Sequence, residues 1–225
     1  MRNIVLINAS PKINEPSTSE YLVDTLGSRI EENAANKYFI NVRQSIKKHK
    51  TEDDFAAISQ ADAMVIVFPL YIFCLPGILM RFLEDYYKFY VENGKSGSKA
   101  KVYAIVNCGF PEPEINLEAV RVIRSFCQHI NAQFRFGILI GGGGMLLGAR
   151  DVPIMKKTLR KLNAAFDTIA RDIESDNLEN LDHLYIAMNF PRRLYLFMGN
   201  RGWHALARNN GLSKKDLFKR PYRAH

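Results

Sequence analysis

The chain has 225 residues, of which 47% are hydrophobic and 24% are charged. Such a composition predicts a folded protein with a sizeable core, and no run approaches the roughly twenty apolar residues that span a bilayer. The formal net charge is +8, and nine Lys/Arg against three Asp/Glu place +6 of it on residues 177–225. The basicity therefore belongs to the C-terminal part of the chain.

The cysteines indicate a reducing compartment. Cys74, Cys108 and Cys127 are widely spaced and form no C-x-x-C pair, which excludes a disulfide framework and an iron–sulfur motif. The N-terminus lacks the basic, apolar and small-residue regions of a signal peptide. We expect a cytoplasmic protein whose cysteines are small buried apolar residues.

The opening stretch predicts a strand, a polar loop and a helix start. Ile4–Ile7 is an apolar run, and helical spacing follows over Glu20–Ile30. A helix N-terminus carries free N–H groups and partial positive charge, so hydroxyls beside it suit a phosphate. Capping and turn formation explain the same residues about as well. Neither a Walker A motif nor a G-x-G-x-x-G fingerprint is present. The loop residues of interest are Ser10, Lys12, Ser17, Thr18 and Ser19.

The next part of the chain predicts a second and a third strand. The third strand, Ala61–Phe68, is apolar throughout, as expected of a buried parallel strand. A loop bracketed by prolines follows, and it is apolar enough to need a flat partner. The basic segment 43–50 is predicted to be a loop, and a solvated surface explains it better than a cofactor phosphate site. The remaining elements here are a strand at 38–42, a short helix at 52–60, and the loop residues Pro69, Leu70, Tyr71, Ile72 and Phe73.

The alternation of strands and helices continues to residue 173. Five strands and five helices predict an α/β fold with a doubly wound parallel sheet, whose ligand lies beyond the carboxyl ends of the strands. We expect the loops after the first, third and fourth strands to converge there. The later elements are a helix from residue 79, a glycine-containing loop at 92–101, a strand at 102–106 ending in Asn107, Cys108 and Gly109, a helix at 117–130, a strand at 134–140, the tetraglycine 141–144 and a helix at 152–173.

These motifs resemble a known family, the flavodoxin-like NAD(P)H-dependent FMN reductases, which include quinone, azo and nitro reductases. The sequence ASPK…STS is similar to the family's phosphate loop, and Pro69-Leu70-Tyr71 followed by Pro76-Gly77 and ILMRFLED resembles its second flavin segment. Asn107-Cys108-Gly109 stands at the third flavin loop. The resemblance covers residues 1–173, with Ala9 in place of the usual glycine.

The resemblance implies a fold, a cofactor and a site. The fold is a five-stranded sheet in the order 2-1-3-4-5 over residues 1–176, followed by a C-terminal helical extension over 177–225. The cofactor is FMN, reduced by NADH or NADPH. Ser10, Lys12, Ser17, Thr18 and Ser19 would hold the phosphate, Pro69, Leu70, Tyr71, Ile72 and Phe73 would line the isoalloxazine ring, and Asn107, Cys108 and Gly109 would lie beside its polar edge.

The implied reaction passes hydride from NAD(P)H to the flavin and then two electrons to a small acceptor, a quinone, nitro or azo compound or free flavin. No catalytic side chain and no metal are expected, because orientation is the protein's main contribution. The alternative is an electron carrier with a protein redox partner, although such carriers are commonly acidic. A third possibility is a non-enzymatic binder that uses the basic C-terminal extension on nucleic acid or anionic lipid. Nucleic acid is disfavoured, because no helix-turn-helix or arginine-and-aromatic strand pattern is present.

The extension interleaves apolar and basic residues. It could pack on the core, complete a homodimer or contact a membrane surface. Our sequence-based hypothesis favours packing or dimerisation, with Trp203, the only tryptophan, as a lid over a neighbouring flavin.

Overall fold

A parallel β-sheet with the strand order 2-1-3-4-5-6 forms the centre of the fold. The computed structural model describes residues 1–220 except 14, 32–34, 95–98, 149–150 and 177–178. Parts of the predicted loop at 92–101 and of the predicted extension at 177–225 therefore lie outside the described residues. The strands are β1 (Arg2–Asn8), β2 (Ala35–Asn41), β3 (Ala63–Pro69), β4 (Lys101–Asn107), β5 (Gln133–Ile140) and β6 (Leu184–Ile186).

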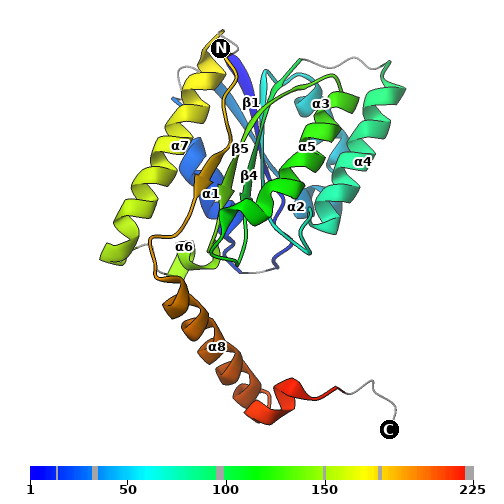
Figure 1. Ribbon diagram of the computed structural model, residues 1–225. Coiled ribbons are helices and arrows are strands. Elements are labelled where there is room, and N and C mark those ends of the chain that lie inside the picture. The colour runs from blue at the N-terminus through cyan, green and yellow to red at the C-terminus, as the bar shows by residue number, and fades with distance from the viewer. Residues whose placement is uncertain (14, 32–34, 95–98, 149–150, 177–178, 221–225) are drawn as a thin grey trace. The chain divides into compact units, whose positions relative to one another are not determined.

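Helices cover both faces of the sheet (Figure 1). One face carries α1 and α7, and the other carries α3, α4 and α5. Strands β3 and β4 are buried along almost their whole length, as expected of parallel strands between two helical layers. The helices are α1 (Thr18–Gly27), α2 (Val42–Lys47), α3 (Thr51–Ser59), α4 (Gly77–Glu92), α5 (Leu117–His129), α6 (Gly144–Gly148), α7 (Lys156–Glu174) and α8 (Arg192–Asn209), with 3₁₀ turns η1 (Pro113–Asn116), η2 (Pro153–Met155) and η3 (Lys214–Phe218).

The doubly wound fold class is confirmed, but the predicted number of strands is one too few. Leu184–Ile186 pairs in parallel with Ile138–Ile140 as a sixth strand beside β5, whereas the sequence analysis assigned it to the extension. Three residues are too short for a hydrophobic period to show in the sequence. The order 2-1-3-4-5 is confirmed for the first five strands.

The sequence analysis predicted a loop at residues 43–50, but only part of this segment is a loop. Residues 42–47 form α2, because the Asn41 side chain caps the helix by accepting a hydrogen bond from Gln44 N over 3.1 Å. Val42 and Ser45 are buried on its inner side. Lys47, Lys48, His49 and Lys50 are exposed, as the solvated-surface interpretation predicted.

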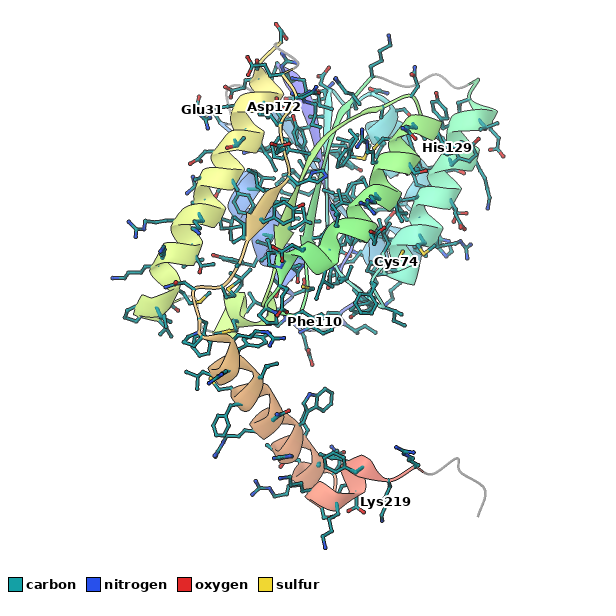
Figure 2. The ribbon with its side chains drawn as sticks, viewed as in Figure 1. Glu31, Cys74, Phe110, His129, Asp172 and Lys219 are labelled. Carbon is teal, nitrogen blue, oxygen red and sulfur yellow. The ribbon has the colours of Figure 1, made fainter. Side chains whose placement is uncertain are left out.

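A buried ionic cluster joins β4, β5 and α7 at the edge of the sheet where the strands begin. Arg135 donates two hydrogen bonds to the Asp172 carboxylate, over 2.8 and 2.7 Å, and both side chains are almost inaccessible. Tyr103 Oη donates to the same carboxylate over 2.6 Å. Figure 2 shows Asp172 at the opposite edge from Phe110, which follows β4. This cluster holds the base of the sheet, far from the predicted site.

The chain divides into two compact units, Met1–Met188 and Asn189–His225. The first contains the sheet, and the second contains α8 and η3. No helix in the described part of the chain is long and apolar enough to cross a membrane. The division into an FMN-binding domain over residues 1–176 and an extension over 177–225 stays a prediction.

Candidate functional site

The loops that follow β1, β3 and β4 line one hollow of about 240 Å³. Parallel strands bring their carboxyl ends to the same edge of the sheet, and in this strand order β1, β3 and β4 are neighbours. All the predicted site residues except Ile72 and Phe73 line this hollow. The lining residues are Ser10, Lys12, Ser17, Thr18, Ser19, Pro69, Leu70, Tyr71, Asn107, Cys108, Gly109 and Gly144.

The start of α1 supplies the polar end of the hollow. Ser17 caps the helix, because its Oγ accepts a hydrogen bond from Glu20 N over 3.1 Å. The hydroxyl proton of Ser17 stays available to donate, and the N–H groups of the first helical residues have no intrahelical acceptor. Capping and anion binding are therefore compatible at this residue. The two alternatives left open by the sequence do not exclude each other.

The loop before α1 is ordered by its own side chains. Ser10 N donates to Asn8 Oδ1 over 3.0 Å, and Ser10 Oγ accepts from Lys12 N over 3.4 Å. Lys12 Nζ lies 3.4 Å from Glu15 Oε2 in a pair that is largely exposed to solvent. The ammonium group is thus near the hollow, with the Glu15 carboxylate beside it.

Asn107 connects the end of β4 to the start of α1. Its buried side-chain amide donates to Ser19 Oγ over 3.3 Å and to the carbonyl of Phe68 over 3.2 Å. On the other side, Thr18 Oγ1 donates to the carbonyl of Gly143 over 3.1 Å. These bonds fix the positions of the three segments that form the polar wall.

The tetraglycine approaches the β4 loop closely. Gly142 N donates to Phe110 O over 2.6 Å, and Gly143 N donates to Cys108 O over 2.7 Å. A Cβ on Gly143 would lie 2.8 Å from Asn107 Oδ1, which is too close for two unbonded atoms. The glycine run therefore permits the close approach of a neighbouring backbone.

The apolar rim of the hollow is a tight turn after β3. Tyr71 and Cys74 exchange backbone hydrogen bonds of 2.9 and 3.0 Å, and the residues between them, Ile72 and Phe73, have φ values of +49° and +59°. A β-branched residue with positive φ is a strained outlier, and such strain is concentrated at functional sites. Ile72 is 94% exposed, so its own burial does not compensate for the strain.

Aromatic side chains extend this rim. Phe73 stacks on Phe110 with a centroid distance of 6.1 Å and an interplanar angle of 17°. Tyr71 is about half exposed and lines the hollow itself. The sequence analysis did not identify Phe110, although its place directly after the β4 loop was a usable signal.

A comparison with protein families places these observations in context. The sequence model of a family described as having a flavodoxin-like fold matches residues 2–133. The chain belongs to this family. The match includes the first four strands and the three loops that line the hollow.

Solved structures agree with the flavodoxin-like assignment. The chain is similar to an NADH:FMN oxidoreductase in its apo form (16% identity, 86% of this chain and 98% of that chain covered, TM-score 0.54). It is also similar to an NAD(P)H:quinone oxidoreductase from Methanothermobacter marburgensis (12% identity, 79% of this chain and 98% of that chain covered, TM-score 0.54). A third similar structure is general stress protein 14 from Treponema denticola in complex with FMN (14% identity, 77% of this chain and 99% of that chain covered, TM-score 0.53). At these identities the likeness shows the fold. A comparison with curated proteins gives no significant match.

The thiol of Cys108 is buried and hydrogen-bonded beside the hollow. Burial raises the pKa of its thiol, the thiol donates to the Phe110 carbonyl over 3.4 Å, and Asn116 Nδ2 donates to its sulfur over 3.5 Å. A neutral, buried thiol is a poor nucleophile. Within the described residues, no group of three or more His, Cys, Asp or Glu side chains could hold a metal ion.

A second, polar hollow of about 350 Å³ adjoins the first and shares Ser10, Lys12 and Ser17 with it. It adds Arg43, which the sequence analysis placed in a solvated loop. Because β2 pairs with β1, residues after β2 reach the same edge of the sheet, and this pairing was the missing information. Its other lining residues are Asn8, Glu15, Pro16, Glu20, Asn41 and Gln44.

Proposed function

We propose that this flavodoxin-like protein binds FMN in the 240 Å³ hollow and acts as an NAD(P)H-dependent oxidoreductase. One observation supports this most strongly: hydroxyls at a helix N-terminus and an apolar, aromatic rim line the same hollow at the carboxyl ends of β1, β3 and β4. A dianionic phosphate suits the first surface, and a flat heteroaromatic ring suits the second. The FMN complex and the NAD(P)H oxidoreductases among the similar structures favour the same function.

The donor set fits the phosphate group. Ser10, Ser17, Thr18 and Ser19 each bring a hydroxyl to one wall, and the partial positive charge of the α1 N-terminus faces the same region. Lys12 adds a nearby cation, with the Glu15 carboxylate beside it. These residues would hold the phosphate mainly through hydrogen bonds, with Thr18 redirecting the hydroxyl proton that it donates to Gly143 O in this structure.

The opposite wall fits the ring system. Pro69, Leu70 and Tyr71 line the hollow, and Leu70 N is held by Asn107 O over 2.8 Å. We propose that Ile72 and Phe73 belong to the rim through the strained turn, although neither lines the hollow itself. Cys108 and Gly109 would lie beside the polar edge of the ring.

When bound, FMN would supply hydride and electron transfer between NAD(P)H and a small acceptor, such as a quinone, nitro or azo compound or free flavin. The chain's own residues would bind the FMN and orient it. Asn107 positions the start of α1, the turn at residues 71–74 shapes the rim, and the neutral Cys108 thiol adds no competing nucleophile. No side chain needs to move a proton.

We also propose that the protein forms a homodimer. A groove of about 740 Å³ between α4 and α5 has a largely apolar lining. Met80, Tyr87 and Val122 are exposed there by 42%, 39% and 38%, and Glu84 and Lys88 on the same groove could pair across a twofold axis. A Met80→Glu variant should change a dimer into a monomer in sedimentation, whereas Ile154→Glu outside the groove should not. A wild-type monomer at micromolar concentration would contradict the proposal.

The three free cysteines support the proposal of a cytoplasmic location, because thiols persist in reducing compartments.

An anaerobic absorption spectrum tests the proposed activity. The purified protein is reconstituted with FMN and mixed with NADH or NADPH. We expect the flavin absorbance to bleach rapidly with at least one nucleotide and to return when a quinone is added. Bound flavin that neither nucleotide reduces would favour the electron carrier with a protein partner.

A further inference from the structure

The second compact unit carries the whole net charge of the protein. Residues 189–225 contain nine Lys/Arg and one Asp/Glu, a net +8, whereas residues 1–188 contain 22 of each. The single acid, Asp216, is already paired, because Lys219 Nζ lies 2.6 Å from it and it closes a capping box with Ser213. The unit therefore presents uncompensated positive charge to its surroundings.

Most basic and most apolar side chains of α8 lie on different sides of the helix. At about 100° per residue, Arg193, Arg201, His204 and Arg208 fall within an arc of about 80°. Leu196, Trp203 and Leu206 fall in a second arc, centred roughly 140° from the first. The separation is incomplete, because Phe197 falls in the first arc, where the Arg201 guanidinium lies 5.9 Å from its ring centroid, and Arg192 falls in the second. Basic side chains nevertheless predominate in the first arc and apolar side chains in the second.

Within the described residues of its own unit, little covers the apolar side of α8. Leu196, Trp203 and Leu206 are 45%, 65% and 54% exposed, and Ala207 is the only buried residue that α8 contributes. The same mixture continues in η3, where Phe218 is 75% exposed beside lysines. Exposed apolar area of this extent on a small unit indicates a binding surface.

We propose that α8 and η3 form a docking surface for an anionic lipid bilayer. An amphipathic helix with Lys/Arg on its polar face and Trp and Leu on the other lies in the plane of a bilayer interface, where headgroup phosphates pair with the cations and acyl chains cover the apolar face. This single partner satisfies both faces of α8 at once. The proposal is independent of the proposed redox activity.

Other partners satisfy only one face. A second copy of α8 could cover the apolar residues but adds no counter-charge, because residues 189–213 contain no Asp or Glu. Nucleic acid would pair with the arginines and leave Trp203 and the leucines in water. A lid over a neighbouring flavin, the hypothesis from the sequence, would likewise leave the basic face without a partner.

Vesicle binding by the full chain tests the proposal. Trp203 is the only tryptophan, so emission excited at a wavelength that tyrosine does not absorb reports this helix alone. Vesicles of phosphatidylcholine are compared with vesicles that contain about 30% phosphatidylglycerol, at about 0.15 M salt. We expect co-sedimentation and a blue shift of Trp203 emission with the anionic vesicles, with partitioning at least about tenfold above the neutral ones.

Matched variants distinguish the effect of the charges on α8 from the effect of the protein's net charge on vesicle binding. The triple change Arg193→Gln, Arg201→Gln, Arg208→Gln should lower partitioning by more than about tenfold, because each basic residue near an anionic surface contributes about fivefold. Lys157→Gln, Arg160→Gln, Lys161→Gln removes the same charge from exposed positions of α7 and should bind like wild type. Leu196→Ser with Leu206→Ser keeps every charge but should reduce both binding and the blue shift.

Several results would overturn the proposal. Equal wild-type partitioning into neutral and anionic vesicles would do so, as would equal losses in the two triple variants. Retention on duplex DNA at the same salt that exceeds vesicle binding would assign the surface to nucleic acid instead. A blue shift that follows protein concentration without lipid would assign it to self-association. The comparison of neutral with anionic vesicles uses only the wild-type chain, so it tests the proposal even if a variant fails to fold.

Discussion

Asn107 donates a hydrogen bond to Ser19 Oγ over 3.3 Å, and this bond joins the end of β4 to the first turn of α1. Both residues are buried and both line the proposed FMN hollow. The bond links the loop that would flank the ring to the helix start that would hold the phosphate. Loss of this hydrogen bond should therefore lower both the stability of the fold and the affinity for the cofactor.

Asn107→Ala should lower the free energy of unfolding by about 1–3 kcal/mol, since it leaves Phe68 O and Ser19 Oγ without their donor. It should also weaken FMN binding by at least about tenfold. Urea unfolding and FMN titration measure the two effects. Asn93→Ala, which removes an exposed amide bonded to Phe89 O, is the control and should leave FMN affinity unchanged.

Gly143→Ala should reduce stability by about 1–3 kcal/mol, because the added Cβ would lie 2.8 Å from Asn107 Oδ1. The variant should also bind FMN more weakly, since Asn107 must shift. Gly148→Ala meets no atom within 4 Å and should be close to neutral. Equal melting temperatures of the two variants would contradict the close approach of Gly143 to Asn107.

Ile72→Gly should raise the free energy of unfolding by up to about 1 kcal/mol, because glycine relieves the positive φ that costs other residues about 1–2 kcal/mol. A more flexible turn should at the same time bind FMN severalfold more weakly. Val152→Gly is the control, because Val152 is exposed with an ordinary φ of −80°, and it should lose stability. Unchanged FMN affinity in Ile72→Gly would remove the turn from the site.

Asp172→Asn should destabilise the protein by about 3–5 kcal/mol at neutral pH, because it leaves Arg135 buried without its carboxylate. Glu118→Gln, which breaks an exposed pair with Arg121, should change stability by less than about 1 kcal/mol. Chemical denaturation of both variants measures the difference. Equal effects would contradict the buried character of the Arg135–Asp172 pair.

The same pair predicts acid sensitivity. Burial alone would raise the pKa of Asp172, but the hydrogen bonds from Arg135 and Tyr103 outweigh it and lower the pKa below its ordinary value of 3.8. A lowered folded-state pKa gives stability that is present above the ordinary pKa and lost as the pH falls through the folded-state value. The stability difference between wild type and Asp172→Asn should therefore shrink as the pH falls below about 4. A difference that is constant down to pH of about 2 would contradict this.

Much of the fold was predictable because its signals are local. The apolar runs of β3 and β4 and the helical spacing of α4 and α5 are visible in the sequence, and their alternation specifies a parallel sheet. The convergence of three loops followed from that topology. β6 was missed because its three residues form a strand only through pairing with β5.

The site was less predictable wherever it depends on tertiary contacts. Positive φ at Ile72 contradicts the usual preference for glycine or asparagine in such turns, so no sequence rule places it there. The need for glycine at residue 143 depends on Asn107, 36 positions away in the chain. Arg43 joins the site region only because β2 lies beside β1.

Titration of the purified chain with FMN and, in parallel, with riboflavin tests the central claim most directly. We expect one FMN per chain with a Kd in the micromolar range or below, and riboflavin at least about a hundredfold weaker, since it lacks the phosphate that the α1 start would hold. Absence of FMN binding would contradict the account. Equal affinity for the two flavins would show that the hydroxyls of Ser10, Ser17, Thr18 and Ser19 cap and order the loop without holding a phosphate.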